Sequence, residues 1–197
     1  MKKILALLLV GLFSQSVFSA DIDPQQLIKQ TTDKVLGEIR ANSEVYKVAP
    51  DQLYALVDEV VLPHFNFVAM TNLALGRHRK EFDTTQKSRI VSEFRALLVR
   101  TYGKALVEYN DQEITYLDMV GSIEKGKVKV KTEIVQAGGA AIPLDYSLRL
   151  GKQGWKVYDI KVDGISLVTN YRSSFAREIK KNGVEGLISL LHERNQK

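Results

Sequence analysis

In the first half of the chain, mostly apolar residues recur at the spacing of a helix. Asp23 and Pro24 are typical of a helix N-cap followed by proline at the first helical position. After them, Ile28, Thr31, Val35 and Ile39 recur at this spacing and predict a first helix. A second amphipathic stripe predicts another helix, ended by Pro63, and consists of Leu53, Leu56, Val57, Val60 and Val61.

A short third helix and a long fourth one follow. The third is predicted at residues 66–75, with Gly76 as its C-terminal stop. Asp83 and Gln86 have the spacing of a capping box, which opens the fourth helix. The stripe of this helix holds for about five turns and consists of Ile90, Phe94, Leu97, Leu98, Thr101, Tyr102, Ala105, Leu106 and Tyr109.

From about residue 112 the pattern alternates with a period of two, as in strands that bury one face. A hairpin turn is predicted at Gly138-Gly139. The four predicted strands are 112–120, 127–135, 144–150 and 155–162. Helical structure follows at 167–181 and, after Gly183, at 184–193. Helices followed by strands that are close in sequence predict an α+β fold, with a four-stranded antiparallel sheet covered on one face by helices.

The N-terminus has the three-part layout of a secretory signal peptide. Lys2 and Lys3 precede an apolar run, Ile4 to Phe13, which is too short to span a bilayer because a span needs about 20 residues. Small and polar residues follow. We therefore predict a signal peptide at 1–20, cleaved near residue 19 or 20, and a single domain at 21–197.

Composition narrows the class of protein further. The formal net charge is +5, and without Lys2 and Lys3 it is +3. This charge could favour anionic surfaces or acidic partners, but it is too weak and dispersed to indicate nucleic acid. The chain has no cysteine, so an exported domain would have to be stable without disulfides. No later apolar run reaches about 18 residues, so we expect a soluble mature protein.

The sequence shows no catalytic or cofactor motif. It has no cysteine nucleophile, no G-x-S-x-G elbow, no H-E-x-x-H pair and no glycine-rich phosphate loop. His64, His78 and His192 lack metal-ligand spacing, so we predict no metal site. Asp159 interrupts an apolar strand, where it is either a hydrogen-bond acceptor or a general base beside a tyrosine. Arg77, Arg79 and Lys80 form either a solvated loop or a docking site for a phosphate or an acidic partner.

Near the C-terminus, residues 155–175 read WKVYDIKVDGISLVTNYRSSF. This segment resembles the signature W-x-V-Y-D-V-x-x-x-G-V-S-L-V-x-N-Y-R-x-x-F of the MlaC-like family, also called toluene-tolerance proteins. The resemblance extends over the mature chain and includes Leu75-Gly76, several positions of the long helix and the ending with Gly183 and Gly186. The sequence departs from the family at Arg77 to Arg79, where relatives often carry an aromatic residue.

The resemblance implies a periplasmic phospholipid-binding protein and no enzyme. Such proteins carry phospholipid as cargo, without a cofactor, between an outer-membrane lipoprotein complex (MlaA-like) and an inner-membrane MCE/ABC transporter complex (MlaD-like). This Mla pathway maintains outer-membrane lipid asymmetry. The family fold is a curved antiparallel sheet covered by helices, with the acyl chains in an apolar cavity between them.

The apolar stripes allow a hypothesis for the cavity wall. We expect these residues to bind lipid: Leu98, Tyr102, Leu106, Val130, Thr132, Leu144, Tyr146, Leu148, Leu167, Val168, Tyr171 and Phe175. Each also suits a packed core, so half of them should touch lipid. Arg172 either stays at the surface or pairs with Asp159.

Two alternatives to a lipid carrier remain open from the sequence. The first is a small cone-fold isomerase or dehydratase that uses Asp159 with Tyr146 or Tyr158 as its acid/base pair, a comparison that rests on fold analogy. The second is a protein-binding adaptor with a filled core and a basic docking surface. A cavity would argue against the adaptor.

Overall fold

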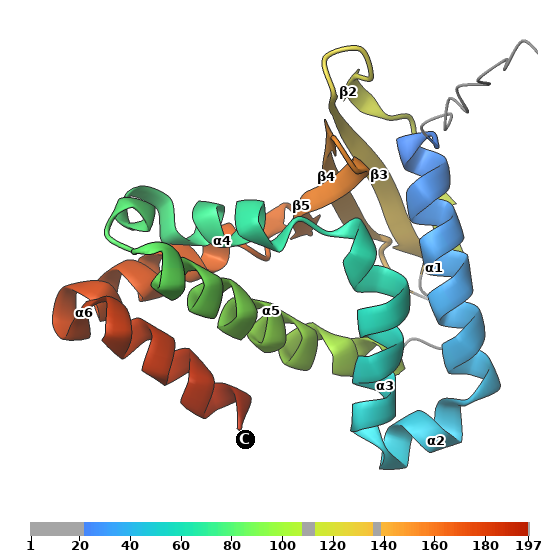
Figure 1. Cartoon of the computed structure of the whole chain (residues 1–197). Helices are drawn as coiled ribbons and strands as arrows, with labels where there is room; N and C mark the ends of the chain where they lie inside the picture. Colours follow the sequence, from blue (N-terminus) through green and yellow to red (C-terminus); the bar gives the residue numbers. More distant parts are fainter. Residues whose placement is uncertain (1–21, 108–112, 136–138, 197) are drawn as a thin grey trace, which may run out of the picture.

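The computed structural model describes residues 22–107, 113–135 and 139–196. The predicted signal peptide, the last position of the long-helix stripe at Tyr109 and Gly138 of the predicted hairpin lie outside these residues. In the described part, five helices (α1–α5) precede an antiparallel sheet and a sixth (α6) follows it (Figure 1). The α+β fold predicted from the sequence is therefore confirmed.

The first helix, α1 (Pro24–Ala41), begins where the sequence predicted it. The Asp23 side chain accepts hydrogen bonds from the backbone N–H groups of Gln25 and Gln26, at 2.9 and 3.1 Å. These bonds satisfy two of the amides that a helix start leaves unpaired. A short helix that the sequence analysis missed, α2 (Ser43–Val48), follows and has no buried residue.

The second predicted helix is present but is not regular along its length. It begins as α3 (Pro50–Leu56), widens into a π-helical turn, η1 (Val57–Val61), and tightens into a 3-10 turn, η2 (Leu62–His64). Pro63 lies in this last turn, where the helix ends as predicted. π-Helical turns are rare, and they occur frequently at functional sites.

Two side-chain caps set the limits of the next elements. The Asn66 side chain accepts from the backbone N–H of Ala69 at 2.9 Å and opens α4 (Phe67–Leu75), which ends at Gly76 with a φ of 56°. A 3-10 turn follows, η3 (Gly76–Lys80). Asp83 and Gln86 then form the predicted capping box through reciprocal bonds of 3.0 and 2.8 Å, and α5 (Thr84–Val107) begins there.

Within the described residues, the sheet has six strands rather than the four that were predicted. The order is β1-β3-β4-β5-β6, and β2 also pairs with β3. The predicted first strand is divided because β1 pairs with residues 132–135 of β3 and β2 with residues 127–129. A short strand after the fourth predicted one extends the other edge. The bounds are β1 Glu113–Tyr116, β2 Val120–Ser122, β3 Lys127–Val135, β4 Ile142–Gly151, β5 Gly154–Val162 and β6 Ile165–Ser166.

A β-bulge in β5 changes which of its residues face the helices. Leu148 pairs with Val157 and Ser147 with Asp159, so Tyr158 is an extra residue on β5. Before the bulge, odd-numbered residues such as Val157 share a face with Leu148. After it, the even-numbered Ile160 and Val162 take over that face, opposite Tyr146 and Leu144. Asp159 is thereby placed on the opposite face of the sheet.

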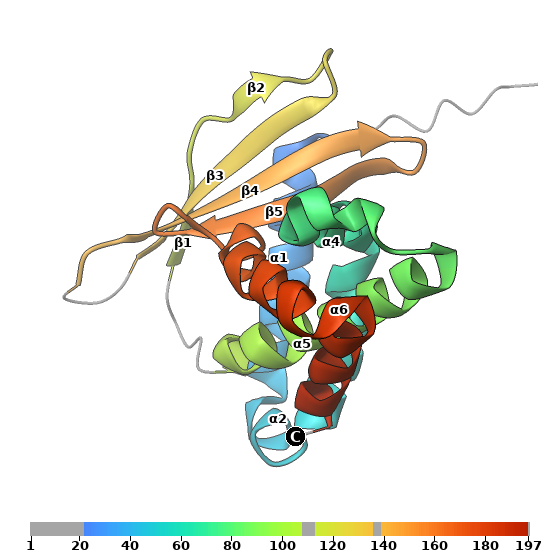
Figure 2. The same ribbon diagram turned by 90° about the vertical axis from the view of Figure 1, so that its left-hand side faces the viewer.

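After β6, a 3-10 turn, η4 (Thr169–Tyr171), leads into α6 (Arg172–Asn195). The helix therefore begins later than the predicted residue 167. Gly183 interrupts α6 with a φ of 72°, as the sequence predicted. Figure 2 shows the sheet as one layer and the helices gathered on one side of it.

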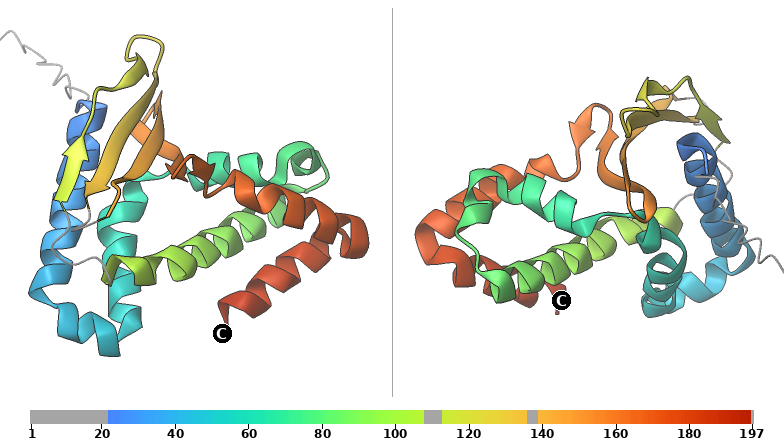
Figure 3. Two further views of the ribbon diagram at one scale, coloured as in Figure 1. Left: turned by 180° about the vertical axis from the view of Figure 1, so that it is seen from behind. Right: turned by 45° about the horizontal axis from the view of Figure 1, so that its top comes forward.

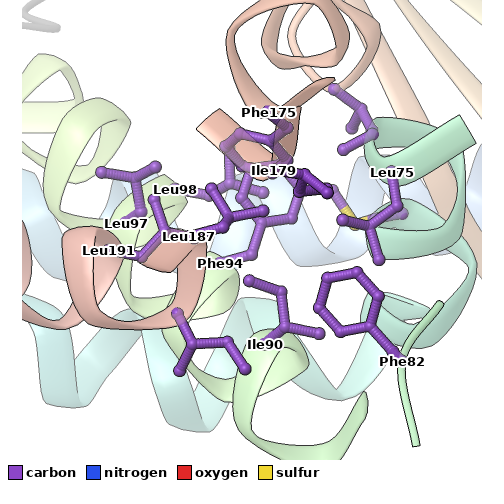
Figure 4. Packing of buried hydrophobic residues seen from close by; sticks show 14 residues of the cluster. Leu75, Phe82, Ile90, Phe94, Leu97, Leu98, Phe175, Ile179, Leu187 and Leu191 are labelled. Atoms are coloured by element: carbon purple, nitrogen blue, oxygen red, sulfur yellow. The ribbon is translucent and has the colours of Figure 1, made fainter. Parts of the chain in front are cut away.

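The apolar interior consists of three clusters instead of one continuous core. The largest lies between α4, α5 and α6, where Ile90, Phe94 and Leu187 are buried (Figure 4). A second joins Leu27 and Ile28 of α1 to the sheet, which curves over this end of the helix (Figure 3). The third joins Val35, Leu36 and Ile39, further along α1, to α3 and η1.

Candidate functional site

A cavity of about 330 Å³ lies where the three clusters meet. Each cluster contributes to its wall: Met70 and Leu98 from the first, Ile28 from the second, and Val35 and Leu36 from the third. Its volume is at the lower end of the range of ligand cavities, about 300–1,000 Å³. The three clusters do not merge into one packed core, and the cavity is the space left between them.

The helical wall comes from α1, η1, α4 and α5. One face of α1 contributes Ile28, Thr31, Thr32, Val35 and Leu36. The hydroxyl of Thr31 donates to the backbone carbonyl of Leu27 at 2.8 Å, so this polar group is satisfied within the helix. The π-helical turn contributes Val57 and Val61.

The sheet wall follows from the register of the strands. Tyr146 pairs with Ile160 and Leu144 with Val162, and all four side chains line the cavity. Ile134 of β3, which pairs with Ile114 of β1, continues the wall; both residues line the cavity. The bulge in β5 is what brings Ile160 and Val162 to this face.

Tyr102 of α5 places a hydroxyl in this apolar wall. Burial raises the pKa of Tyr102 from 10.0 to about 12, and Tyr171 adds to the shift through its charge and a hydrogen bond. The hydroxyl therefore remains uncharged at neutral pH. A neutral Tyr102 suits a wall that faces an apolar ligand.

The raised pKa of Tyr102 predicts a loss of stability in alkali. The unfolded chain releases this proton near pH 10.0, whereas the folded protein holds it to about pH 12. The free energy of unfolding should therefore fall as the pH rises between these values. Below pH 10.0 both states hold the proton, so Tyr102 does not make the free energy of unfolding depend on pH there. Urea unfolding of wild type and Tyr102→Phe at several pH values in this range checks the prediction. The free energy of unfolding should fall less steeply with pH in the variant, and an equally steep fall would contradict the prediction.

His64 also lines the cavity and has a shifted pKa. Burial lowers the pKa of His64, and the charge of Lys156 lowers it further. Lys156 is held nearby because its Nζ donates to the carbonyl of Pro63 at 2.5 Å. The imidazole is therefore neutral at neutral pH, like the rest of the wall.

The structure places six of the twelve predicted lipid-binding residues on the cavity wall. They are Leu98, Tyr102, Leu106, Leu144, Tyr146 and Leu167. Contact of these residues with lipid stays a prediction.

The other six predicted residues do not border the cavity. Val130 and Leu148 are fully buried between the sheet and α1, and Val168 and Phe175 pack in the α4–α5–α6 cluster. Tyr171 packs against that cluster, with its ring 5.2 Å from that of Phe94. Thr132 is buried, and its hydroxyl donates to the carbonyl of Leu144 at 2.8 Å.

Sequence reasoning missed most of the helical wall. The stripe with Ile28, Thr31 and Val35 was visible, but it predicted only a packed helix. The stripe of the second helix also contained Val57 and Val61, which line the cavity. A stripe shows which face of a helix is buried, and it does not show whether that face meets side chains or open space.

Asp159 lies outside the cavity in a structural hydrogen-bond network. It is 7% exposed, and its carboxylate accepts from the Ser166 hydroxyl at 2.7 Å. The same hydroxyl accepts from the backbone N–H of Thr169 at 2.9 Å. Asp159 therefore holds β6 and η4 against β5, which matches the hydrogen-bond role left open by the sequence.

Arg172 does not pair with Asp159. Its guanidinium donates twice to the carbonyl of Leu73, at 3.0 and 2.8 Å, and so ties the start of α6 to the end of α4. Arg77, Arg79 and Lys80 lie exposed on η3, which is a 3-10 turn rather than the predicted irregular loop.

Neither a membrane span nor a metal site is found in the described ranges. None of the helices at 22–107 or 139–196 is both long and apolar enough to cross a bilayer. Within the same part of the chain, no three His, Cys, Asp or Glu side chains are grouped so that they could hold a metal ion.

The sequence profile described as MlaC protein matches residues 29–193, which is most of the chain. The chain belongs to the MlaC family. Among curated relatives of this MlaC-family chain, the toluene tolerance protein ttg2D of Pseudomonas putida is 28% identical over 161 residues, covering 81% of this chain and 74% of that protein. The intermembrane phospholipid transport system binding protein MlaC of Haemophilus influenzae is 27% identical over 177 residues, covering 88% and 83%.

A solved structure shares the fold of this MlaC-family chain. It is the phospholipid-binding protein from Ralstonia solanacearum in complex with a phospholipid, with a TM-score of 0.81 and 32% sequence identity. The match covers 88% of this chain and 97% of that one.

Proposed function

We propose that this protein binds phospholipid in the cavity between α1, α5 and the sheet and carries it through the periplasm. The observation that supports this most is the apolar cavity of about 330 Å³ in a fold shared with a protein solved in complex with a phospholipid. On this proposal the N-terminal segment is a signal peptide that directs export. The carrier exchanges lipid with an MlaA-like complex at the outer membrane and an MlaD-like complex at the inner membrane, and it thereby maintains outer-membrane lipid asymmetry.

The physical reason for an enclosed carrier is the cost of exposing acyl chains to water. A diacyl lipid has roughly 30 methylenes, and each costs about 0.8 kcal/mol when exposed, so exposure of both chains costs on the order of 25 kcal/mol. Transfer from a bilayer into an apolar cavity exchanges one apolar environment for another, so its free energy is close to balanced. A carrier can then accept and release lipid without a chemical step.

We propose no catalytic role for the cavity. The Asp159 carboxylate of the isomerase alternative is engaged with Ser166 and does not line the cavity. Of its two candidate partners, Tyr146 lines the cavity, on the opposite face of the sheet from Asp159, and Tyr158 does not line the cavity. An adaptor with a filled core is disfavoured by the cavity itself.

Native mass spectrometry of the mature protein, purified from a bacterial periplasm, tests the proposal. We expect a protein peak shifted by the mass of a phospholipid, and the same lipid in an organic extract of the sample. A lipid-free mass that persists after incubation with phospholipid vesicles would show that the cavity does not hold phospholipid.

A further inference from the structure

A second hollow lies beside the cavity, on a different face of α4. Phe67 and Met70 of α4 line the cavity, whereas Val68, Thr71 and Leu75 line this second hollow, which measures about 330 Å³. Its other side is α5, where Lys87, Ile90 and Val91 share one helical face. Figure 1 shows the ends of α4 and α5 on either side of the turn that contains η3. We call this hollow the basic groove.

The charge of the basic groove is of one sign. Arg79 and Lys80 of η3 and Lys87 of α5 line it, and none of the nine described residues around it is acidic. In the described part of the chain, no carboxylate forms an ion pair with any of these three cations. Arg79 donates to the carbonyl of Gly76 at 2.8 Å, which holds its side chain against the turn. Three cations around one hollow favour an anionic ligand.

The groove is apolar where it is deepest. Leu75 and Ile90 line it and are also buried members of the α4–α5–α6 cluster (Figure 4), whereas Val68 is 59% exposed. Thr71 is 1% exposed, and within the described residues its hydroxyl has no hydrogen-bond partner. An unpaired hydroxyl that is closed off from water is costly to the fold.

We propose that the basic groove binds an acidic peptide segment of a partner protein. Carboxylates of the segment pair with Arg79, Lys80 and Lys87, and an apolar side chain between them packs on Leu75 and Ile90. A peptide fits better than a membrane surface because the hollow is concave, and its apolar floor lies below the cations where a flat bilayer does not reach. The inference rests on the proposed function, since a carrier that exchanges lipid with membrane complexes must dock to proteins.

The basic groove and the cavity are lined by residues of the same two helices, α4 and α5. α4 supplies wall residues to both hollows. Thr71 lines the groove and its neighbour Met70 lines the cavity, so a peptide in the groove and a lipid in the cavity would contact different sides of α4. The same holds for α5, which contributes Lys87 to the groove and Leu98 to the cavity.

A binding experiment with a defined probe tests the proposal. The probe is a short fluorescein-labelled peptide of alternating glutamate and leucine, and its control has glutamine in place of glutamate. Binding to the mature protein is measured by fluorescence anisotropy at about 0.1 M salt, where charges more than about 10 Å apart are largely screened. The groove variant is Arg79→Glu with Lys87→Glu, and the matched charge control is Lys125→Glu with Lys152→Glu, which lie exposed at the turns of the sheet.

We expect the groove variant and the glutamine peptide each to weaken binding by at least about tenfold. The charge control should bind the acidic peptide as wild type does, because charges beyond about 10 Å are screened. Equal losses in the two double variants, or equal affinity for both peptides, would overturn the proposal. So would failure of the acidic peptide to bind wild type, whether or not inorganic phosphate or phosphatidylglycerol vesicles bind in the same charge-dependent way.

The lipid content of the same samples separates this inference from the proposed function. Native mass spectrometry should show phospholipid in wild type and in both double variants, since none of the four substituted residues lines the cavity. Peptide binding without lipid in any sample would reject the carrier and leave the groove. Lipid in every sample without peptide binding would reject the groove and leave the carrier.

Discussion

Leu144→Glu is expected to lower the affinity of the protein for phospholipid by about tenfold. Leu144 is half-buried on β4, and its side chain lines the cavity opposite Val162. A carboxyl placed there would lie against acyl chains without a hydrogen-bond partner, which costs about 1–3 kcal/mol. A cost of about 1.4 kcal/mol already lowers affinity tenfold.

The lipid-bound fraction in native mass spectra of protein purified from the periplasm measures this loss. Leu144→Met is the matched control, because methionine keeps the wall apolar at similar volume and should retain lipid. The prediction would be wrong if Leu144→Glu folded normally and carried as much phospholipid as wild type. That result would place the acyl chains away from β4.

Leu148→Ala is expected to lower the free energy of unfolding by about 2–5 kcal/mol while the lipid content stays the same. Leu148 lies four residues after Leu144 on the same face of β4, but it is fully buried against Val130 and Val157. Truncation of such a side chain loses its burial and leaves a void that the surrounding residues fill only in part.

Urea unfolding of Leu148→Ala and Leu144→Ala, side by side, checks this difference. Leu144 borders the cavity, so its truncation widens an existing space instead of creating a new void, and it should cost less than truncation of Leu148. Equal stability losses in the two alanine variants would contradict the division between cavity wall and packed core. Loss of lipid in Leu148→Ala alone would contradict it as well.

Elements that depend on neighbours in sequence were predictable. The N-cap at Asp23 and the capping box at Asp83 and Gln86 follow from side chains that reach backbone groups within a few residues. The stop at Gly76 follows from the positive φ that glycine adopts without a steric penalty. The limits of β3 also agree with its alternating pattern at 127–135. Such interactions form in the same way whatever the rest of the fold does.

Irregular features were not predictable, because the hydrophobic pattern of one segment does not show how that segment pairs with its neighbours. The bulge at Tyr158 exists only in the pairing of β5 with β4, and it changes which residues face the helices. The break between β1 and β2 likewise depends on how both pair with β3. The π-helical turn interrupts a stripe that gave no sign of it.

The sequence by itself determined the fold class, the starts of α1, α4 and α5, the family resemblance and which faces are apolar. Only the tertiary structure decided which apolar residues line a cavity and which pack together. Leu144 and Leu148 have the same residue type, strand and face, and they differ in what lies opposite them. Hydrophobic periodicity shows which side chains are removed from water. It has the same form for residues of a cavity wall and for residues of a packed core. The cavity is the space that remains where the three clusters meet between α1, α5 and the sheet.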